Sequence, residues 1–153
     1  MDFRSYGLET PAFSLAGKEC MCRVVDMYDA DTLTLVVPVF DGVYKFACRV
    51  YGIDTAEVKS GSAETKEQAQ KSKNRMLQLC GVRVDLDRVY VRKEVQRLLA
   101  EKVVVVWCKF GEFDKYGRPL VWIYDTRDGV ELAGELIKEG LANAYFGGTK
   151  EKF

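Results

Sequence analysis

The chain has 153 residues, of which 48% are apolar and 30% are charged; this composition is typical of one folded globular domain and excludes disordered and fibrous classes. Lysine plus arginine equals aspartate plus glutamate at 23 each, so any recognition of phosphate has to be local. Scattered cysteines, no signal peptide and no long apolar run favour a soluble, intracellular protein, which we expect to be a monomer without membrane contact.

The first part of the chain predicts an arm followed by three strands. Residues 1–17 mix Gly, Pro and Ser with isolated aromatics and show no period, so we expect an N-terminal arm before a domain of residues 18–153. Val, Thr, Leu and Tyr dominate three segments, 20–27, 32–39 and 43–53, which read as strands. Asp41-Gly42 predicts a tight hairpin between the second and third, because such a turn needs a positive φ that Gly and Asp tolerate.

Residues 59–102 are charged and amphipathic, which predicts two helices. The first fits a capping box at Thr65-Lys66-Glu67-Gln68 and a stop at Gly81, and the second ends near Glu101. The segment 82–90 fits either a strand or a loop. Basic residues of the first helix are expected on one solvated face: Lys66, Lys71, Lys73 and Arg75.

The remaining elements complete a small barrel. Residues 103–110 and 119–125 predict a second hairpin, and residues 132–137 predict a helix that ends at Gly140. We expect Trp107 and Trp122, which lie in these strands, to be core residues. Three strands, a helical insertion, two strands and a helix suit an α+β fold: a five-stranded OB-fold β-barrel with two to three helices packed on it.

Arg49 and Arg118 are the candidate phosphate-binding residues. Cleavage of a phosphodiester depends on positioning and on cationic stabilisation of the charge that builds on the phosphate oxygens, and the chain has no histidine. A guanidinium reaches two phosphate oxygens at once and keeps its proton. Arg49 lies on a predicted strand among apolar neighbours, where an unpaired charge is costly, so it should face a ligand or a carboxylate.

Carboxylates supply the candidate metal site. Asp31 and Asp54 stand at the start and the end of neighbouring predicted strands, so folding can bring both to one rim of the barrel. Carboxylate oxygens suit Ca²⁺ or Mg²⁺, and no zinc-like spacing of ligands exists. Glu57 follows shortly after Asp54 on a loop and is free to take a proton from water or to orient it.

Each of these segments has a simpler interpretation when it is taken alone. Asp29-Ala-Asp31 is more often a turn than a metal site, and Lys115-Tyr116-Gly117-Arg118 is most simply a solvated hairpin loop. Arg49 could be the partner of a structural aspartate. The occurrence of all the segments together, in one order, favours a functional site.

The segments Asp29-Ala-Asp31-Thr32, Arg49, Asp54-Thr55-Ala56-Glu57 and Asp114-Lys115-Tyr116-Gly117-Arg118 resemble the active-site segments of the staphylococcal nuclease family. The resemblance runs from about residue 20 to about residue 145. It implies a Ca²⁺-dependent nuclease on an OB-fold that cleaves DNA and RNA and leaves 3′-phosphate ends. The choice of Ca²⁺ over Mg²⁺ or Mn²⁺ rests on the resemblance alone.

The resemblance also implies a role for each matching residue. It assigns them as follows: Asp31, Asp54 and the Thr55 carbonyl hold the ion, Glu57 is the general base or orients the water, Arg49 and Arg118 clamp the phosphate, Lys115 and Tyr116 contact the neighbouring phosphate and nucleoside, Tyr145 or Phe146 stacks on a base, and Asp29 lies beside the metal. The alternative is an inactive OB module that binds single-stranded nucleic acid or a protein partner. Intact charges at the five catalytic and metal positions favour the enzyme.

Overall fold

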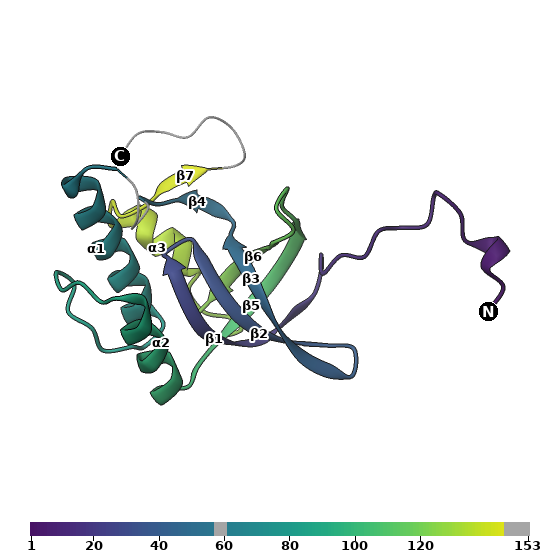
Figure 1. Cartoon of the computed structure of the whole chain (residues 1–153), viewed down its shortest axis with the longest axis horizontal. Helices are drawn as coiled ribbons and strands as arrows, with labels where there is room; N and C mark the ends of the chain where they lie inside the picture. Colours follow the sequence, from purple (N-terminus) through teal and green to yellow (C-terminus); the bar gives the residue numbers. More distant parts are fainter. Residues whose placement is uncertain (57–60, 146–153) are drawn as a thin grey trace.

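A computed structural model describes residues 1–56 and 61–145. Five strands form a closed barrel in the order β1-β2-β3-β6-β5, all antiparallel except the short parallel pairing of β3 with β6 (Figure 1). The barrel strands are β1 (Glu19–Asp29), β2 (Thr32–Val39), β3 (Gly42–Val50), β5 (Val104–Phe113) and β6 (Pro119–Tyr124). The α+β barrel with its helices confirms the OB-type fold predicted from the element order.

A two-stranded sheet and three α-helices complete the domain. The small sheet pairs β4 (Gly52–Asp54) with β7 (Asn143–Tyr145). The helices are α1 (Ala63–Leu79), α2 (Arg92–Glu101) and α3 (Leu132–Lys138). Helices α1 and α2 lie against one side of the barrel, and the N-terminal residues leave from the other side (Figure 1). In the described part of the chain, no helix is both long enough and apolar enough to cross a membrane.

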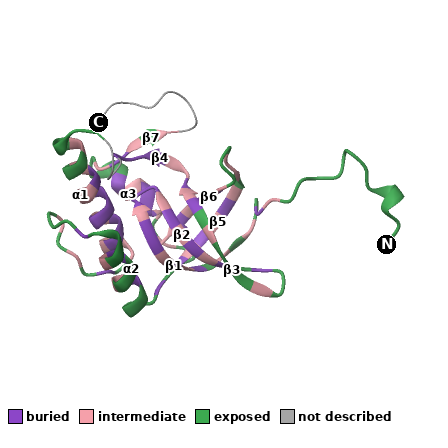
Figure 2. Ribbon diagram, in the orientation of Figure 1, coloured by how far each residue is buried: buried purple, intermediate pink, exposed green. Residues whose placement is uncertain are grey.

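The barrel interior is filled by alternate residues of the strands, as strand geometry requires, although β3 contributes only its last part, Cys48 and Val50. Leu33, Leu35 and Val37 of β2 are buried, and so are the alternate residues of β5 and β6, which appear as purple bands along the strands in Figure 2. Most of these side chains are small or β-branched. The interior of a five-stranded barrel is narrow, and short side chains fill it.

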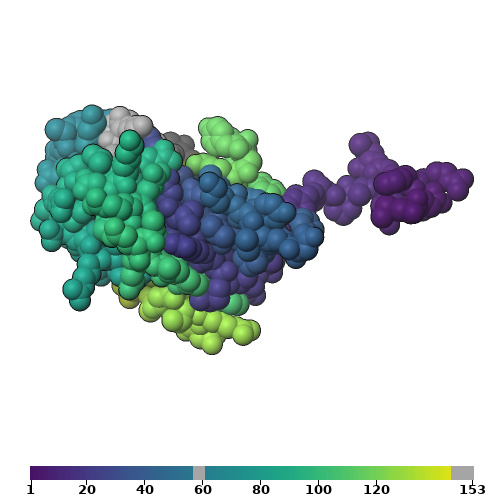
Figure 3. All heavy atoms as spheres, turned by 60° about the horizontal axis from the view of Figure 1, so that its bottom comes forward, coloured from purple at the N-terminus to yellow at the C-terminus, as the bar shows by residue number. Residues whose placement is uncertain are grey.

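The N-terminal arm separates from the body of the molecule, as Figure 3 shows in its space-filling view. Residues 1–13 are exposed, with a short 3₁₀ turn at Phe3–Ser5. Leu15 is buried, and the amide of Gly17 donates to the Phe110 carbonyl at 2.9 Å. These contacts fix the end of the arm to β5.

Two predictions for α1 need correction. The cap of α1 is Ser62, whose hydroxyl accepts from the Thr65 amide at 3.1 Å, so the capping box predicted at Thr65 is wrong. Lys73 is only 3% exposed and packs inward rather than toward solvent. Burial lowers the pKa of Lys73, although the nearby carboxylates of Asp29 and Asp26 oppose this shift.

Two turns of the chain differ in detail from the sequence prediction. The β2–β3 hairpin forms as predicted, but the positive φ of 52° falls on Phe40 rather than on Gly42. The third predicted strand, 43–53, is divided because Gly52 has a φ of 86°, which a residue without a Cβ adopts readily. The division sends β4 away from the barrel toward β7, and this places Asp54.

Asp26 joins the barrel to α2. Its Oδ2 accepts from Arg92 Nη2 at 2.9 Å and from Gln96 Nε2 at 3.0 Å, and its Oδ1 accepts from the Met27 amide at 2.9 Å. Burial acts to raise the pKa of Asp26, but the hydrogen bonds from Gln96 and Arg92 outweigh it and hold the pKa below its usual value. Folding therefore stabilises the ionised form of the Asp26 carboxylate relative to its protonated form.

We expect Asp26→Asn to lower the free energy of unfolding at neutral pH by ~1–3 kcal/mol, because charge-assisted hydrogen bonds to Arg92 are lost. Since the folded pKa is depressed, this stabilisation is complete above the unfolded pKa of ~4 and disappears as the pH falls through the folded value. Urea unfolding of both proteins at several pH values measures it. A difference that does not shrink in acid contradicts the assignment, and Asp41→Asn in the exposed hairpin loop is the control.

Candidate active site

Arg49 of β3 lies between two buried carboxylates at one rim of the barrel. Its Nη1 is 3.2 Å from Oδ2 of Asp31, and its Nη2 is 3.5 Å from Oδ1 of Asp54. All three side chains are nearly buried, with exposed fractions of 12% for Arg49, 10% for Asp31 and 5% for Asp54. The expectation that Arg49 faces a carboxylate is confirmed, and it faces two.

The backbone explains why these groups meet. Asp31 occupies the turn between β1 and β2, and its carbonyl accepts from the Val50 amide at 2.9 Å, which extends the β2–β3 ladder into the turn. Its Oδ2 accepts from the Thr55 amide at 3.1 Å, and its Oδ1 accepts from the Thr32 hydroxyl at 3.1 Å. Both carboxylate oxygens are therefore held before any ligand arrives.

Only oxygen atoms are available here as metal donors. They belong to the carboxylates of Asp31 and Asp54 and to Thr55, whose buried Oγ1 has no hydrogen-bond partner among the described residues. No group of three His, Cys, Asp or Glu side chains gathers as a metal site within residues 1–56 and 61–145. Two carboxylates with a neutral oxygen fit a hard cation that keeps part of its water shell.

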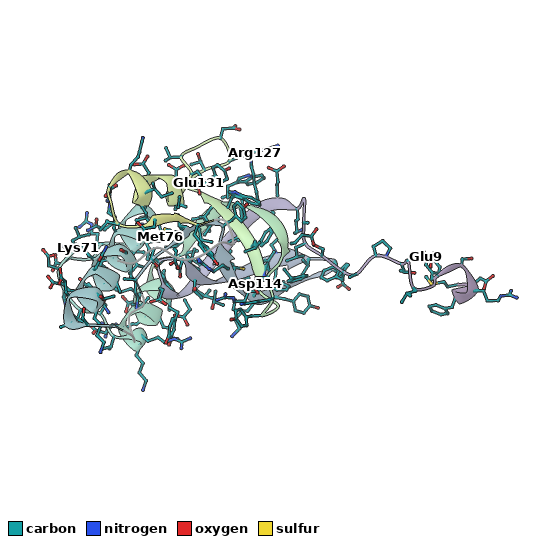
Figure 4. The ribbon with its side chains drawn as sticks, turned by 90° about the horizontal axis from the view of Figure 1, so that it is seen from above. Glu9, Lys71, Met76, Asp114, Arg127 and Glu131 are labelled. Carbon is teal, nitrogen blue, oxygen red and sulfur yellow. The ribbon has the colours of Figure 1, made fainter. Side chains whose placement is uncertain are left out.

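A pocket of about 440 Å³ opens beside this rim, and Arg49 belongs to both. Four residues that the sequence assigned to the site share its wall with Arg49: Lys115, Tyr116, Arg118 and Tyr145. They come from the β5–β6 turn and from β7, which are far apart along the chain. Figure 4 shows the turn through its labelled residue Asp114.

The β5–β6 turn holds Arg118 by a dense set of hydrogen bonds to Asp114. Oδ2 of Asp114 accepts from Arg118 Nε at 2.7 Å, while Oδ1 accepts from the amides of Tyr116 and Arg118, each at 2.9 Å. Burial acts to raise the pKa of Asp114, but the hydrogen bonds from Arg118 and Tyr116 prevail and hold the pKa below its usual value. Asp114 is thus an anion that fixes the guanidinium by one edge.

The other edge of that guanidinium remains available. Among the described residues, no acceptor binds the terminal nitrogens of Arg118. The Tyr116 ring, which is 72% exposed, lies 5.4 Å from Arg118 Cζ and 5.2 Å from Lys115 Nζ. Two cations and an aromatic face therefore point into a space that an anionic, ring-containing ligand could occupy.

Two further predicted residues have different outcomes. Asp29 is buried at the end of β1, where it pairs in register with Thr32. Glu57 lies outside the described residues, and so does Phe146, the alternative to Tyr145. Sequence reasoning missed Tyr51, which lines the pocket two residues after Arg49; strand alternation could have placed the two side chains on one face.

Removing Arg49 should destabilise the fold as well as the site. We expect Arg49→Met to cost ~3–5 kcal/mol of unfolding free energy in EDTA, because two buried carboxylates lose their shared cation. Added Ca²⁺ should raise the melting temperature of this variant more than that of the unchanged protein.

Thermal unfolding with EDTA and with Ca²⁺ measures both effects. Arg118→Met is the matched control, since the Asp114 carboxylate keeps its two amide donors and should tolerate the loss better. Equal stability of Arg49→Met and the unchanged protein in EDTA contradicts the expectation.

A comparison with family models matches residues 47–152 to the staphylococcal nuclease homologue model. The match covers more than half of the chain and includes Arg49, Asp54, Arg118 and Tyr145. Asp31, in the turn before β2, lies ahead of it. A search of curated proteins found no match.

Proposed function

Because the chain belongs to the staphylococcal nuclease homologue family, we propose that it is a metal-dependent nuclease that hydrolyses phosphodiester bonds of DNA, RNA or both. The observation that carries this proposal is the placement of Arg49 and Arg118 on one pocket, with Arg49 joined to two carboxylates. Such a pocket offers cations where phosphate charge develops and carboxylates where a metal is held.

The two arginines would divide the work on the phosphate. Attack of water on phosphorus and loss of the 5′ oxygen give a 3′-phosphate and a 5′-hydroxyl, and negative charge builds on the non-bridging oxygens during attack. Arg118, held through Nε by Asp114, presents its terminal nitrogens to those oxygens. Arg49 is fixed at 3.3 Å to the Val50 carbonyl as well as to its carboxylates, so its position is set before substrate binds.

Glu57 is proposed to take the proton from the attacking water. It follows Asp54 and Thr55 in the sequence, and Thr55 is tied to Asp31 through its amide. The role of Glu57 is supported by its place in this segment and by the absence of histidine from the chain. A carboxylate can act as such a base when it is within hydrogen-bond reach of the water.

A hard cation fits the donors described above. We propose that Asp31 and Asp54 hold it through their carboxylates and Thr55 through its carbonyl, with Asp29 placed two residues from Asp31 to support the site. Bound Ca²⁺, or Mg²⁺ or Mn²⁺ in its place, would neutralise charge on the scissile phosphate. Lys115, Tyr116 and Tyr145 would contact the adjoining phosphate and nucleosides, since all three line the pocket.

The experiment is cleavage of end-labelled single-stranded DNA and RNA with Ca²⁺, Mg²⁺ or Mn²⁺, each against EDTA. We expect metal-dependent cutting that leaves 3′-phosphate ends, and Glu57→Gln separates this activity from a contaminant. A protein that retains the oligonucleotide without cutting it under any ion is instead a nucleic-acid-binding module with the residues of a nuclease.

Arg118→Ala should lower the cleavage rate by roughly 10²–10³, the usual effect of removing one donor to a developing oxyanion. Its free energy of unfolding should change by only about 1 kcal/mol, because Asp114 keeps the amides of Tyr116 and residue 118 as partners. Single-turnover rates and urea unfolding give the two numbers. The control is Arg97→Ala on the exposed face of α2; an undiminished rate in Arg118→Ala removes the assignment.

A further inference from the structure

A row of aromatic and basic side chains follows the outer face of β5 and β6 and extends to Tyr51, after β3, and to Arg127, after β6. We call it the aromatic stripe and define it by six residues: Tyr51, Trp122, Lys109, Tyr124, Trp107 and Arg127. The alternate residues of the same strands, including Cys108 and Ile123, are fully buried inside the barrel. Trp107 and Trp122 are only partly buried, so the prediction that they are core residues is wrong.

The members of the aromatic stripe lie next to one another along the surface. The rings of Tyr51 and Trp122 have centroids 4.6 Å apart at 45°. Lys109 is the strand partner of Trp122, and its Nζ lies 5.0 Å from the centre of the Tyr124 ring. Tyr124 is the strand partner of Trp107, over which Arg127 Cζ lies at 5.2 Å.

The aromatic stripe runs from the pocket to the far end of the hairpin. Tyr51 lines the pocket together with Arg49, and it also contacts Trp122. Figure 4 shows Asp114, in the turn beside the pocket, and Arg127 at opposite ends of β5 and β6. The aromatic stripe is therefore continuous with the proposed cleavage pocket.

The strands make room for these rings. A Cβ on Gly111 of β5 would lie 3.2 Å from Cζ3 of Trp122, so glycine at this position lets the indole lie close to the sheet. On the flanking strands β1 and β3, outward-facing residues such as Met21, which lies beside Trp107, and Ala47 are not aromatic. The rings are thus concentrated along one path.

We propose that the aromatic stripe binds a single-stranded nucleic acid that continues out of the pocket across β6 and β5. Bases stack on aromatic side chains with little regard to sequence, and phosphates bind the cations beside them. A duplex keeps its bases paired and stacked, so it cannot use the rings. The proposal rests on the proposed function only in taking the pocket as the place where one phosphodiester is held.

Carboxylates near the two cations do not prevent this use. Glu19 Oε1 is 3.6 Å from Lys109 Nζ, but both side chains are about half exposed, and water and salt weaken such a surface pair. Asp125, close to Arg127 in sequence, uses its Oδ1 to accept from the amides of Thr126 and Val130, each at 2.7 Å. A phosphate can therefore compete for Lys109 and approach Arg127.

Intrinsic tryptophan fluorescence can test this proposal, because the only two tryptophans of the chain both lie in the aromatic stripe. In EDTA, an oligothymidylate of about 12 nucleotides, within the range of OB-fold site sizes, should quench the tryptophan fluorescence. It should also bind at least about tenfold more tightly than one of about 3 nucleotides, since several stacked bases each add affinity. Neither measurement needs a variant.

Two variants test the path itself. Arg127→Ser should reduce the salt dependence of binding to the longer strand by about 0.7 in log–log slope, the value for one phosphate contact. Trp107→Leu should weaken the longer strand at least about fivefold and leave the shorter one unchanged. Tyr44→Ala, an exposed aromatic at the β2–β3 hairpin, is the matched control and should change neither.

The outcomes separate this proposal from the nuclease itself. Quenching and length-dependent affinity without cleavage under any metal support the aromatic stripe and reject the enzyme. Cleavage with equal affinity for both lengths and no quenching supports the enzyme and overturns the aromatic stripe. A duplex that binds as tightly as the single strand of equal length also overturns it, as does the absence of any oligonucleotide binding.

Discussion

A nearly buried guanidinium between two nearly buried carboxylates is the constraint around which the rest of this domain is arranged. Charges in such surroundings are tolerated only when their partners are complete, because each ion gives up its hydration. Completing them for Arg49 requires the β1–β2 turn to deliver Asp31 and the short strand β4 to deliver Asp54. Arg49 is also the strand partner of Leu120, at the parallel seam that closes the barrel. Barrel closure and site assembly therefore depend on the same residue.

The local charges explain how a chain with no net charge can present a pocket lined by arginines. Asp114 is bound to Arg118 through one edge of the guanidinium only, and the described contacts leave the outer edge to a ligand. Asp31 and Asp54 balance Arg49 by binding its two terminal nitrogens. Each of the two arginines of the pocket is therefore offset by carboxylates that position it. The net charge of the chain is the sum over all such pairs, so it does not show that the outer edge of the Arg118 guanidinium is left to a ligand.

Much of the fold follows from periodicity, while the exceptions follow from contacts between segments distant in sequence. Alternation located the barrel strands, and the helical stripes located α1 and α2. Alternation assigns residues to two faces without saying which face is covered, and this is why Trp107 and Trp122 were misplaced: short side chains already fill the narrow interior. The ordered motifs identified Arg49 and Arg118, whereas Tyr51 belongs to no motif, and only its place on the same strand face as Arg49 could have indicated it.

Because β4 pairs with β7, near the end of the described chain, the site can assemble only late in synthesis. Asp54 stands opposite Asn143 in that sheet, and Tyr145, from the same late strand, forms part of the pocket wall. During synthesis on the ribosome, Asp31, Arg49 and Asp54 all emerge long before the strand that fixes the last of them. The carboxylates and the pocket therefore cannot be brought into their final arrangement until almost all of the described chain has left the exit tunnel. A nascent or prematurely terminated chain would carry the charged residues without the assembled pocket.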